Sequence, residues 1–169
     1  DTNKRFKKRT GLSILERYGM TETNMSTSNP YRGNRIAGTI GKPLPGIEIR
    51  ITDRVTGEVL PDGDIGVIEQ RGDNIFSGYW EMPEKTREAF TTDNFFITGD
   101  LAKLDKNGYL TLVGRDSDMI ISGGLNVYPK EVENLIDEID EVLESAVIGV
   151  PHPDPGEGVI AVGVWEAKL

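Results

Sequence analysis

The sequence contains no cysteine, and its only histidine is His152. Without cysteine, disulfides, thiolate nucleophiles and zinc–thiolate sites are excluded. His152 lies between two prolines, which favours a loop residue over a general base. The sequence also lacks an apolar run near the roughly 20 residues of a membrane-spanning helix, and it begins with a polar, basic segment unlike a signal peptide. We therefore expect a cytoplasmic protein without a membrane span.

Acidic residues outnumber basic ones, 28 to 19, which gives a net charge of -9. This balance argues against a nucleic-acid-binding surface. A length of 169 residues allows one domain or two small ones with a real core. The 20 glycines suit many tight turns between short strands.

The first segment predicts a helix over 2–10 that ends at Gly11. A basic run lies on it, at Lys4, Arg5, Lys7, Lys8 and Arg9. The run suits either a phosphate-binding patch or a solvated helix face. Residues 24–40 are rich in Ser, Thr, Asn, Pro and Gly, so we expect a loop there.

Residues 40–113 have the pattern of a β-rich subdomain. Alternating segments at 47–51 and 66–71 predict strands, and 101–113 predicts a hairpin with its turn at 106–108. A short helix with proline in its first turn is expected over 83–90. Strands at this spacing favour a small barrel or a curled antiparallel sheet.

A composition change at 115–118 predicts a domain boundary. Beyond it, apolar segments flank Gly123-Gly124, a helix is expected from Pro129 to about Val142, and strands are expected over 145–150 and 159–165. These elements predict the start of a compact α+β domain. The predicted fold class is therefore mixed α/β, with domains at 1–115 and 116–169.

The segment Tyr18-Gly19-Met20-Thr21-Glu22-Thr23 follows a β-prone run and predicts a polar turn at a strand end. Open α/β sheets bind ligands at such edges. Glu22 between two threonines suits Mg²⁺, which takes one or two carboxylates and completes its shell with phosphate and water. The same residues also suit a loop in which the threonines cap backbone N–H groups.

Three further sites have two interpretations each. Asp100, in Thr98-Gly99-Asp100, could accept both ribose hydroxyls or simply form a turn. Arg115 could reach a ribose or phosphate oxygen or lie on the surface. Gly123-Gly124 could admit a ligand close to the backbone or form a plain hairpin turn. Trp80 and Trp165 are expected to be packing residues.

Taken together, the motifs resemble the adenylate-forming acyl-CoA synthetases. These motifs occur in the family's order and spacing: Tyr18-Gly19-Met20-Thr21-Glu22, Thr98-Gly99-Asp100, Gly114-Arg115 and the segment 122–133, SGGLNVYPKEVE. The resemblance covers essentially the whole chain. Within the family, 15–25 and 147–152 are most similar to malonate–CoA ligases.

The resemblance implies a role for each residue of the first motif. Tyr18 and Gly19 would lie at the ATP or adenylate, with Tyr18 stacked on the adenine. Met20 would border the acyl pocket. Thr21 would contact phosphate, and Glu22 would hold Mg²⁺.

Residues of the later motifs also receive roles from the resemblance. Asp100 and Arg115 would grip the ribose, and Gly123 and Gly124 would line the tunnel for the CoA thiol. The small C-terminal domain of such enzymes rotates about a hinge, which falls here at Asp116 and Ser117. Family members usually have Asp or Lys at the position of Ser117, so this residue departs from the pattern.

The implied activity is ATP-dependent ligation of a carboxylate, malonate or a similar acid, to CoA through an acyl-adenylate. Alternatives are another short or medium-chain acid, transfer to a carrier protein, or a noncatalytic β-rich binding module. The family's phosphate loop is expected before Asp1 and its adenylation lysine after Leu169. The 169 residues alone are therefore expected to be inactive, with the remainder of the same enzyme chain as their partner.

Overall fold

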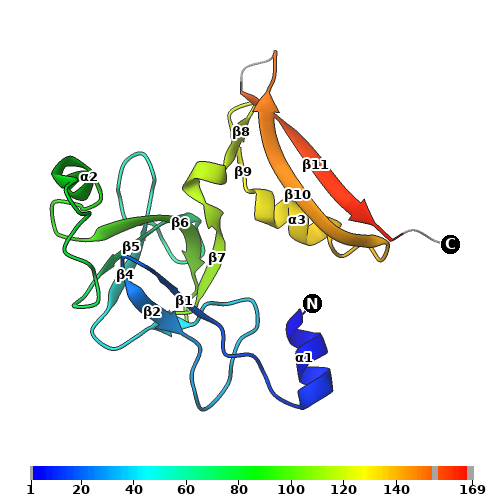
Figure 1. The fold of residues 1–169 in the computed structure, drawn as a ribbon, viewed down its shortest axis with the longest axis horizontal. Coiled ribbons are helices and arrows are strands. Elements are labelled where there is room, and N and C mark those ends of the chain that lie inside the picture. The colour runs from blue at the N-terminus through cyan, green and yellow to red at the C-terminus, as the bar shows by residue number, and fades with distance from the viewer. Residues whose placement is uncertain (1, 154–155, 167–169) are drawn as a thin grey trace. The chain divides into compact units, whose positions relative to one another are not determined.

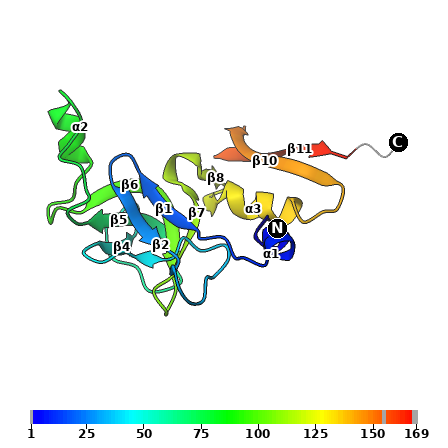
Figure 2. The same ribbon diagram turned by 60° about the horizontal axis from the view of Figure 1, so that its bottom comes forward.

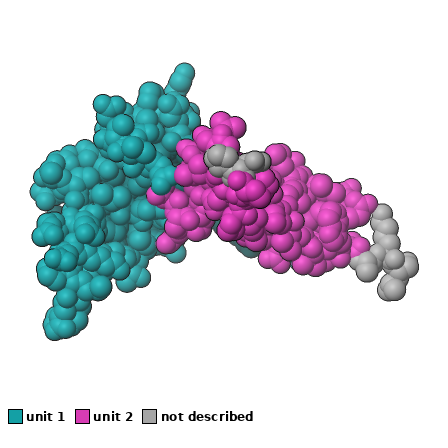
Figure 3. Space-filling model, turned by 90° about the horizontal axis from the view of Figure 1, so that it is seen from above, with its two compact units in different colours: residues 1–112 teal, residues 113–169 magenta. Residues whose placement is uncertain are grey.

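A computed structural model describes residues 2–153 and 156–166, and it divides into two compact units, 1–112 and 113–169 (Figure 3). The expected boundary at 115–118 lies a few residues after this division. Each unit is described by itself.

The first unit begins with helix α1, Thr2–Thr10 (Figure 1). Gly11 follows it with φ +73°, and its N–H bonds to the carbonyl oxygen of Lys7 at 2.9 Å. This left-handed residue closes the helix as predicted. None of the helix residues is buried, and the basic side chains are exposed.

A three-stranded sheet follows, in the order β1–β2–β3. It consists of β1 (Arg17–Met20), β2 (Asn24–Ser28) and β3 (Lys42–Pro43), and both pairings are antiparallel. The prediction of a loop over 24–40 was wrong for β2. This strand is polar, yet Ser26 and Thr27 are fully buried, because their hydroxyls bond within the protein instead of to water.

The larger sheet has the order β4–β5–β6–β7 (Figure 2). Its strands are β4 (Glu48–Thr52), β5 (Gly66–Arg71), β6 (Phe96–Leu104) and β7 (Leu110–Arg115). The pairings of β5 with β4 and β6 are antiparallel. Among the described residues the sheet is open, so the barrel alternative was wrong and the antiparallel-sheet alternative holds.

A hydrophobic core lies on one side of this sheet. It contains Tyr18, Ile51, Ile68, Ala102 and Leu110, each at most 8% exposed. The register pairs Ile51 with Ile68, which puts both on one face. Helix α2 (Pro83–Glu88) lies between β5 and β6 in sequence and begins at proline, as predicted.

The second unit contains a short 3-10 helix (Asp116–Asp118), the hairpin β8 (Ile120–Ser122) and β9 (Leu125–Val127), and helix α3 (Pro129–Ile136). The long hairpin of β10 (Val142–Pro151) and β11 (Glu157–Trp165) follows. Helix α3 is six residues shorter than predicted, because the chain turns between Asp137 and Glu141 before β10. No helix of the described residues is long and apolar enough to cross a membrane.

Candidate functional site

The motif at residues 18–23 is only partly a turn, because its first half belongs to strand β1 of the β1–β2 hairpin. Tyr18, Gly19 and Met20 lie in β1, and the chain reverses at Thr21–Thr23. The expectation of a turn beginning at Tyr18 was therefore wrong. A side chain on Gly19 would collide with the backbone carbonyl of Asn24, so glycine is required where the two strands come close together.

Tyr18 connects this hairpin to the larger sheet. Its hydroxyl donates to Oδ2 of Asp100 on β6 at 2.7 Å. The two residues are 8% and 6% exposed, respectively. The structure thus brings together two motifs that are 82 residues apart in sequence. Tyr18 also packs in the core, so a nucleotide base could contact only the small exposed part of its ring.

Asp100 is presented by a bulge and not by the predicted chain reversal. Ile68 of β5 faces three residues of β6, 98–100, because Val67 pairs with Leu101 and Glu69 with Ile97. Gly99 has φ +73°, a conformation that glycine adopts without strain. The Thr98 hydroxyl accepts the N–H of Asp100 at 3.0 Å and donates to the Ile68 carbonyl at 2.9 Å. The bulge is thus fixed on both sides.

The turn residues differ in their surroundings. Thr21 is exposed, Glu22 is half-buried and Thr23 is fully buried. The Thr23 hydroxyl accepts the N–H of Met20 at 3.3 Å, as the capping interpretation predicts for this threonine. The Met20 sulfur lies 3.8 Å from the Tyr18 hydroxyl. Thr21 and Glu22 are therefore the polar side chains that the turn presents outward.

A residue that the sequence did not single out contacts Glu22. The Tyr79 hydroxyl donates to Glu22 Oε1 at 3.2 Å. Burial raises the pKa of Tyr79, and the neighbouring Glu22 carboxylate raises it further. The Ser-Gly-Tyr-Trp sequence at 77–80, polar and aromatic outside any predicted strand, was the available signal.

Glu22 fits a cation that is shared with a phosphate. Its Oε2 makes no hydrogen bond within the described residues, whereas Oε1 is taken by Tyr79. Those residues include no group of three or more acidic or histidine side chains that could enclose a metal ion. A single half-buried carboxylate suits Mg²⁺ only when phosphate and water complete the coordination shell.

The other predicted site residues belong to the second unit. Arg115 ends β7 and is exposed. Asp116 and Ser117 lie in the 3-10 helix, where the Ser117 hydroxyl donates to Asp118 Oδ1 at 2.9 Å. Gly123 and Gly124 connect β8 to β9 and are exposed. Their φ angles of +57° and +80° are those of a type I′ hairpin turn.

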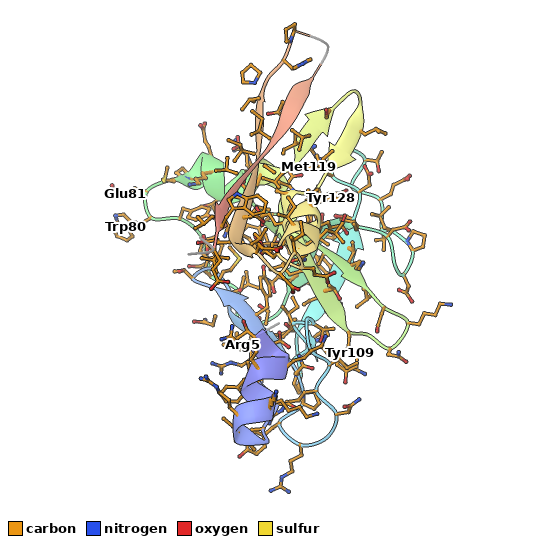
Figure 4. All side chains as sticks on the ribbon, turned by 90° about the vertical axis from the view of Figure 1, so that its right-hand side faces the viewer. Arg5, Trp80, Glu81, Tyr109, Met119 and Tyr128 are labelled. Carbon is orange, nitrogen blue, oxygen red and sulfur yellow. The ribbon has the colours of Figure 1, made fainter. Side chains whose placement is uncertain are left out.

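The prediction that Trp80 and Trp165 are packing residues was wrong. Trp80 is 87% exposed and Trp165 is 60% exposed. Figure 4 shows Trp80 projecting outward from its loop beside Glu81. Trp80 lines a surface hollow with Tyr79, Pro83, Thr86 and Arg87.

Comparison with known proteins identifies the relatives of this fold. Residues 1–80 match the family described as AMP-binding enzyme. The chain is 44% identical over 162 residues to a probable CoA ligase from Humulus lupulus and 42% identical over 159 residues to malonate–CoA ligase from Arabidopsis thaliana. Each alignment covers 94% of this chain and 26% of the relative.

The ATP-bound crystal structure of MatB from Rhodopseudomonas palustris is also similar. It superposes with a TM-score of 0.96 at 58% identity, over 98% of this chain and 33% of that protein. This agreement confirms the predicted mixed α/β fold of adenylate-forming enzymes. The chain spans about a quarter of the length of the two CoA-ligase relatives and a third of the solved structure.

Proposed function

We propose that this chain, whose residues 1–80 match the AMP-binding enzyme family and whose homologues are acyl-CoA ligases, is part of an ATP-dependent carboxylate–CoA ligase. The reaction has two steps. A carboxylate attacks the α-phosphate of ATP, which gives an acyl-adenylate and pyrophosphate. The CoA thiol then attacks the acyl carbon and AMP leaves, which gives a thioester.

The observation that carries this proposal is the hydrogen bond between Tyr18 and Asp100. It joins the hairpin that presents Thr21 and Glu22 to the strand that presents Asp100. A nucleotide requires an aromatic ring for its base and a carboxylate for its ribose. Its polyphosphate, with the bound cation, requires exposed hydroxyl and carboxylate groups such as those of this turn. Their meeting on separate elements supports a nucleotide site more strongly than any one motif.

In this proposal, each group has a role in binding or orientation. Tyr18 and Gly19 border the adenine, and Asp100 accepts a ribose hydroxyl. Thr21 donates to a phosphate oxygen and Glu22 holds Mg²⁺. When bound, Mg²⁺ would neutralise charge that develops on the phosphates. Met20 borders the acyl group.

The remaining proposed roles belong to residues of the second unit. Arg115 contacts the ribose, Gly123 and Gly124 line the approach of the CoA thiol, and Asp116 and Ser117 form the hinge. Malonate is the proposed acid, supported by the 42% identity to a malonate–CoA ligase. A carrier-protein thiol is the alternative acceptor for the same adenylate.

The test is Glu22→Gln in the complete enzyme, followed by ATP–pyrophosphate exchange with malonate. Losing a charged metal contact should slow exchange at least about a hundredfold, since such contacts supply several kcal/mol in the transition state. Glu58→Gln, at an exposed loop position, is the matched control and should exchange normally. Exchange that survives Glu22→Gln would remove Glu22 from the site.

The acceptor and the acid are tested separately. Thioester formation with free CoA and not with a carrier protein identifies a CoA ligase. Exchange that is supported by longer acids but not by malonate would reject malonate as substrate. Failure of the complete chain to bind ATP would favour a noncatalytic binding module instead.

A further inference from the structure

The loop at residues 74–79 is fastened to the turn that carries Glu22. The N–H of Phe76 donates to the Glu22 carbonyl oxygen at 2.8 Å, and the Asn74 side chain donates to the Thr23 carbonyl oxygen. The Asn24 side chain donates back to the Asn74 carbonyl oxygen at 3.4 Å. These three bonds fix the backbone of the turn. They leave the orientation of the Glu22 side chain to a fourth contact.

The fourth contact is the bond from the Tyr79 hydroxyl to Glu22 Oε1, at 3.2 Å. It is unlike the other three, because it acts on the carboxylate itself. A glutamate side chain at a half-buried turn has several rotamers, and an oriented donor selects among them. With Oε1 accepting the Tyr79 hydroxyl, Oε2 has no hydrogen bond within the described residues and is the more available oxygen for a ligand.

Tyr79 is itself held from three directions. Its N–H donates to the Thr86 hydroxyl on α2 at 2.9 Å. Its ring meets that of Phe76 edge-on, with centroids 4.8 Å apart, and the Lys85 ammonium lies 4.6 Å from the ring centroid. The preceding Gly78 has φ +147°, and a side chain there would meet that of Thr86. A donor fixed in this way can impose its direction on the glutamate.

We propose that Tyr79 is a positioning residue that orients the Glu22 carboxylate, so that Oε2 faces the cation and the polyphosphate. This inference rests on the proposed function, because it takes Glu22 as the cation-binding carboxylate. Tyr79 does not touch the nucleotide in this role. It acts through Glu22, as hydrogen-bonded partners of metal-binding carboxylates do.

The test compares Tyr79→Phe with Tyr109→Phe in the complete enzyme. Tyr79→Phe removes only the hydroxyl and keeps the ring against Phe76. Tyr109→Phe removes a hydroxyl that bonds to the Asn34 carbonyl oxygen at 3.4 Å, elsewhere in the same unit. The measurement is the affinity of Mn²⁺ for the complex of the enzyme with a non-hydrolysable ATP analogue. Electron spin resonance detects the free Mn²⁺ and thereby reports how much is bound.

We expect Tyr79→Phe to weaken Mn²⁺ binding about tenfold, the size found for partners of ligating residues. Tyr109→Phe should leave it unchanged. In a Glu22→Ala background, Tyr79→Phe should have no further effect, because the group through which it acts is gone. A purely structural role would lower the melting temperature and weaken Mn²⁺ binding equally in both backgrounds.

The outcomes separate this inference from the proposed function. If Glu22→Ala weakens Mn²⁺ binding and Tyr79→Phe changes nothing, the positioning role is wrong and the proposed function stands. If Glu22→Ala leaves both binding and exchange intact, both assignments fail. Should Tyr79→Phe not fold, Glu22→Asp tests the contact from the other end. It keeps the charge but shortens the reach to the hydroxyl, and undiminished Mn²⁺ affinity would overturn the proposal.

Discussion

The hydroxyl of Tyr18 donates to Asp100 at 2.7 Å inside the protein, although 82 residues separate the two. The bond serves folding whether or not a nucleotide is present, because a buried carboxylate needs hydrogen-bond donors. It also determines which way the Asp100 side chain faces. This single hydrogen bond therefore affects both the stability of the protein and the geometry of the proposed ribose site.

Tyr18→Phe should destabilise the protein by about 1–3 kcal/mol, because it removes a donor from a buried carboxylate. Urea unfolding of the variant measures the change. Tyr31→Phe is the control, since Tyr31 is 79% exposed and should unfold like the wild type. Equal stability of Tyr18→Phe and wild type would show that other donors satisfy Asp100.

Gly19→Ala should also destabilise the first unit, by about 1–3 kcal/mol, as overpacking does. The added methyl group meets the Asn24 carbonyl, which belongs to the paired strand and cannot move aside alone. At Gly114 no atom lies within 4 Å of an added methyl group. Gly114→Ala is therefore the matched control, and thermal melting that ranks the two variants the other way round would contradict the packing argument.

Gly123→Asn should separate the two half-reactions of the complete enzyme. Asparagine tolerates the positive φ of a type I′ turn, so it adds a side chain without breaking the hairpin. Gly123→Leu would strain the turn itself and confuse the result. If Gly123 lines the path of the CoA thiol, thioester formation should fall about tenfold or more while pyrophosphate exchange is kept. Unchanged thioester formation would place the path elsewhere.

The stability of the first unit should depend on Asp93 at acid pH. The Arg50 guanidinium and, next, the Thr91 hydroxyl hold the pKa of Asp93 at about 2, below its ordinary 3.8. Because the folded-state pKa is lowered, the stabilisation is complete above about pH 4 and is lost as the pH falls toward 2. Asp93→Asn should melt below the wild type at pH 7.

The difference in melting temperature between Asp93→Asn and wild type should shrink between pH 4 and 2, where the wild-type carboxylate takes up its proton. Asp62→Asn serves as control, because Asp62 is an exposed carboxylate without a hydrogen bond in the described residues. A difference that stays constant down to pH 2 would mean that Asp93 acts through packing and not through its charge.

The hairpins and most of the strands could be predicted because local residues determine them. Gly123-Gly124 and Asn107-Gly108 have the backbone freedom that tight turns need, and apolar alternation flanks them. Strand β2 could not be predicted, because its Asn-Met-Ser-Thr-Ser sequence has no apolar alternation. Its burial depends on hydrogen bonds from the Ser26 hydroxyl to the Thr23 hydroxyl and from the Thr27 hydroxyl to the Ile40 carbonyl oxygen, and these partners meet only in the folded chain.

For the candidate site, the sequence suggested residue types, and their roles remain predictions. The carboxylates of Glu22 and Asp100 suggested oxygen ligands for a cation and a ribose. That suggestion did not depend on knowing that a turn carries Glu22 and a bulge carries Asp100. The contact of Tyr79 with Glu22 spans 57 residues and depends on the path of the 74–79 loop. No local pattern contains that path. The exposure of Trp80 escaped prediction for the same reason, since composition alone favours burial of a tryptophan.

The bulge at Gly99 determines which deletions strand β6 can tolerate. It contains two residues more than a regular ladder would place opposite Ile68. Because side chains alternate with a period of two, Phe96 and Ala102 keep the same face on either side of it. Deleting one residue there would send Leu101 and Ala102 to the wrong faces and unfold the sheet. Deleting two would preserve the core but remove the bulge that presents Asp100, so length variants of this strand that still fold should differ by even numbers of residues.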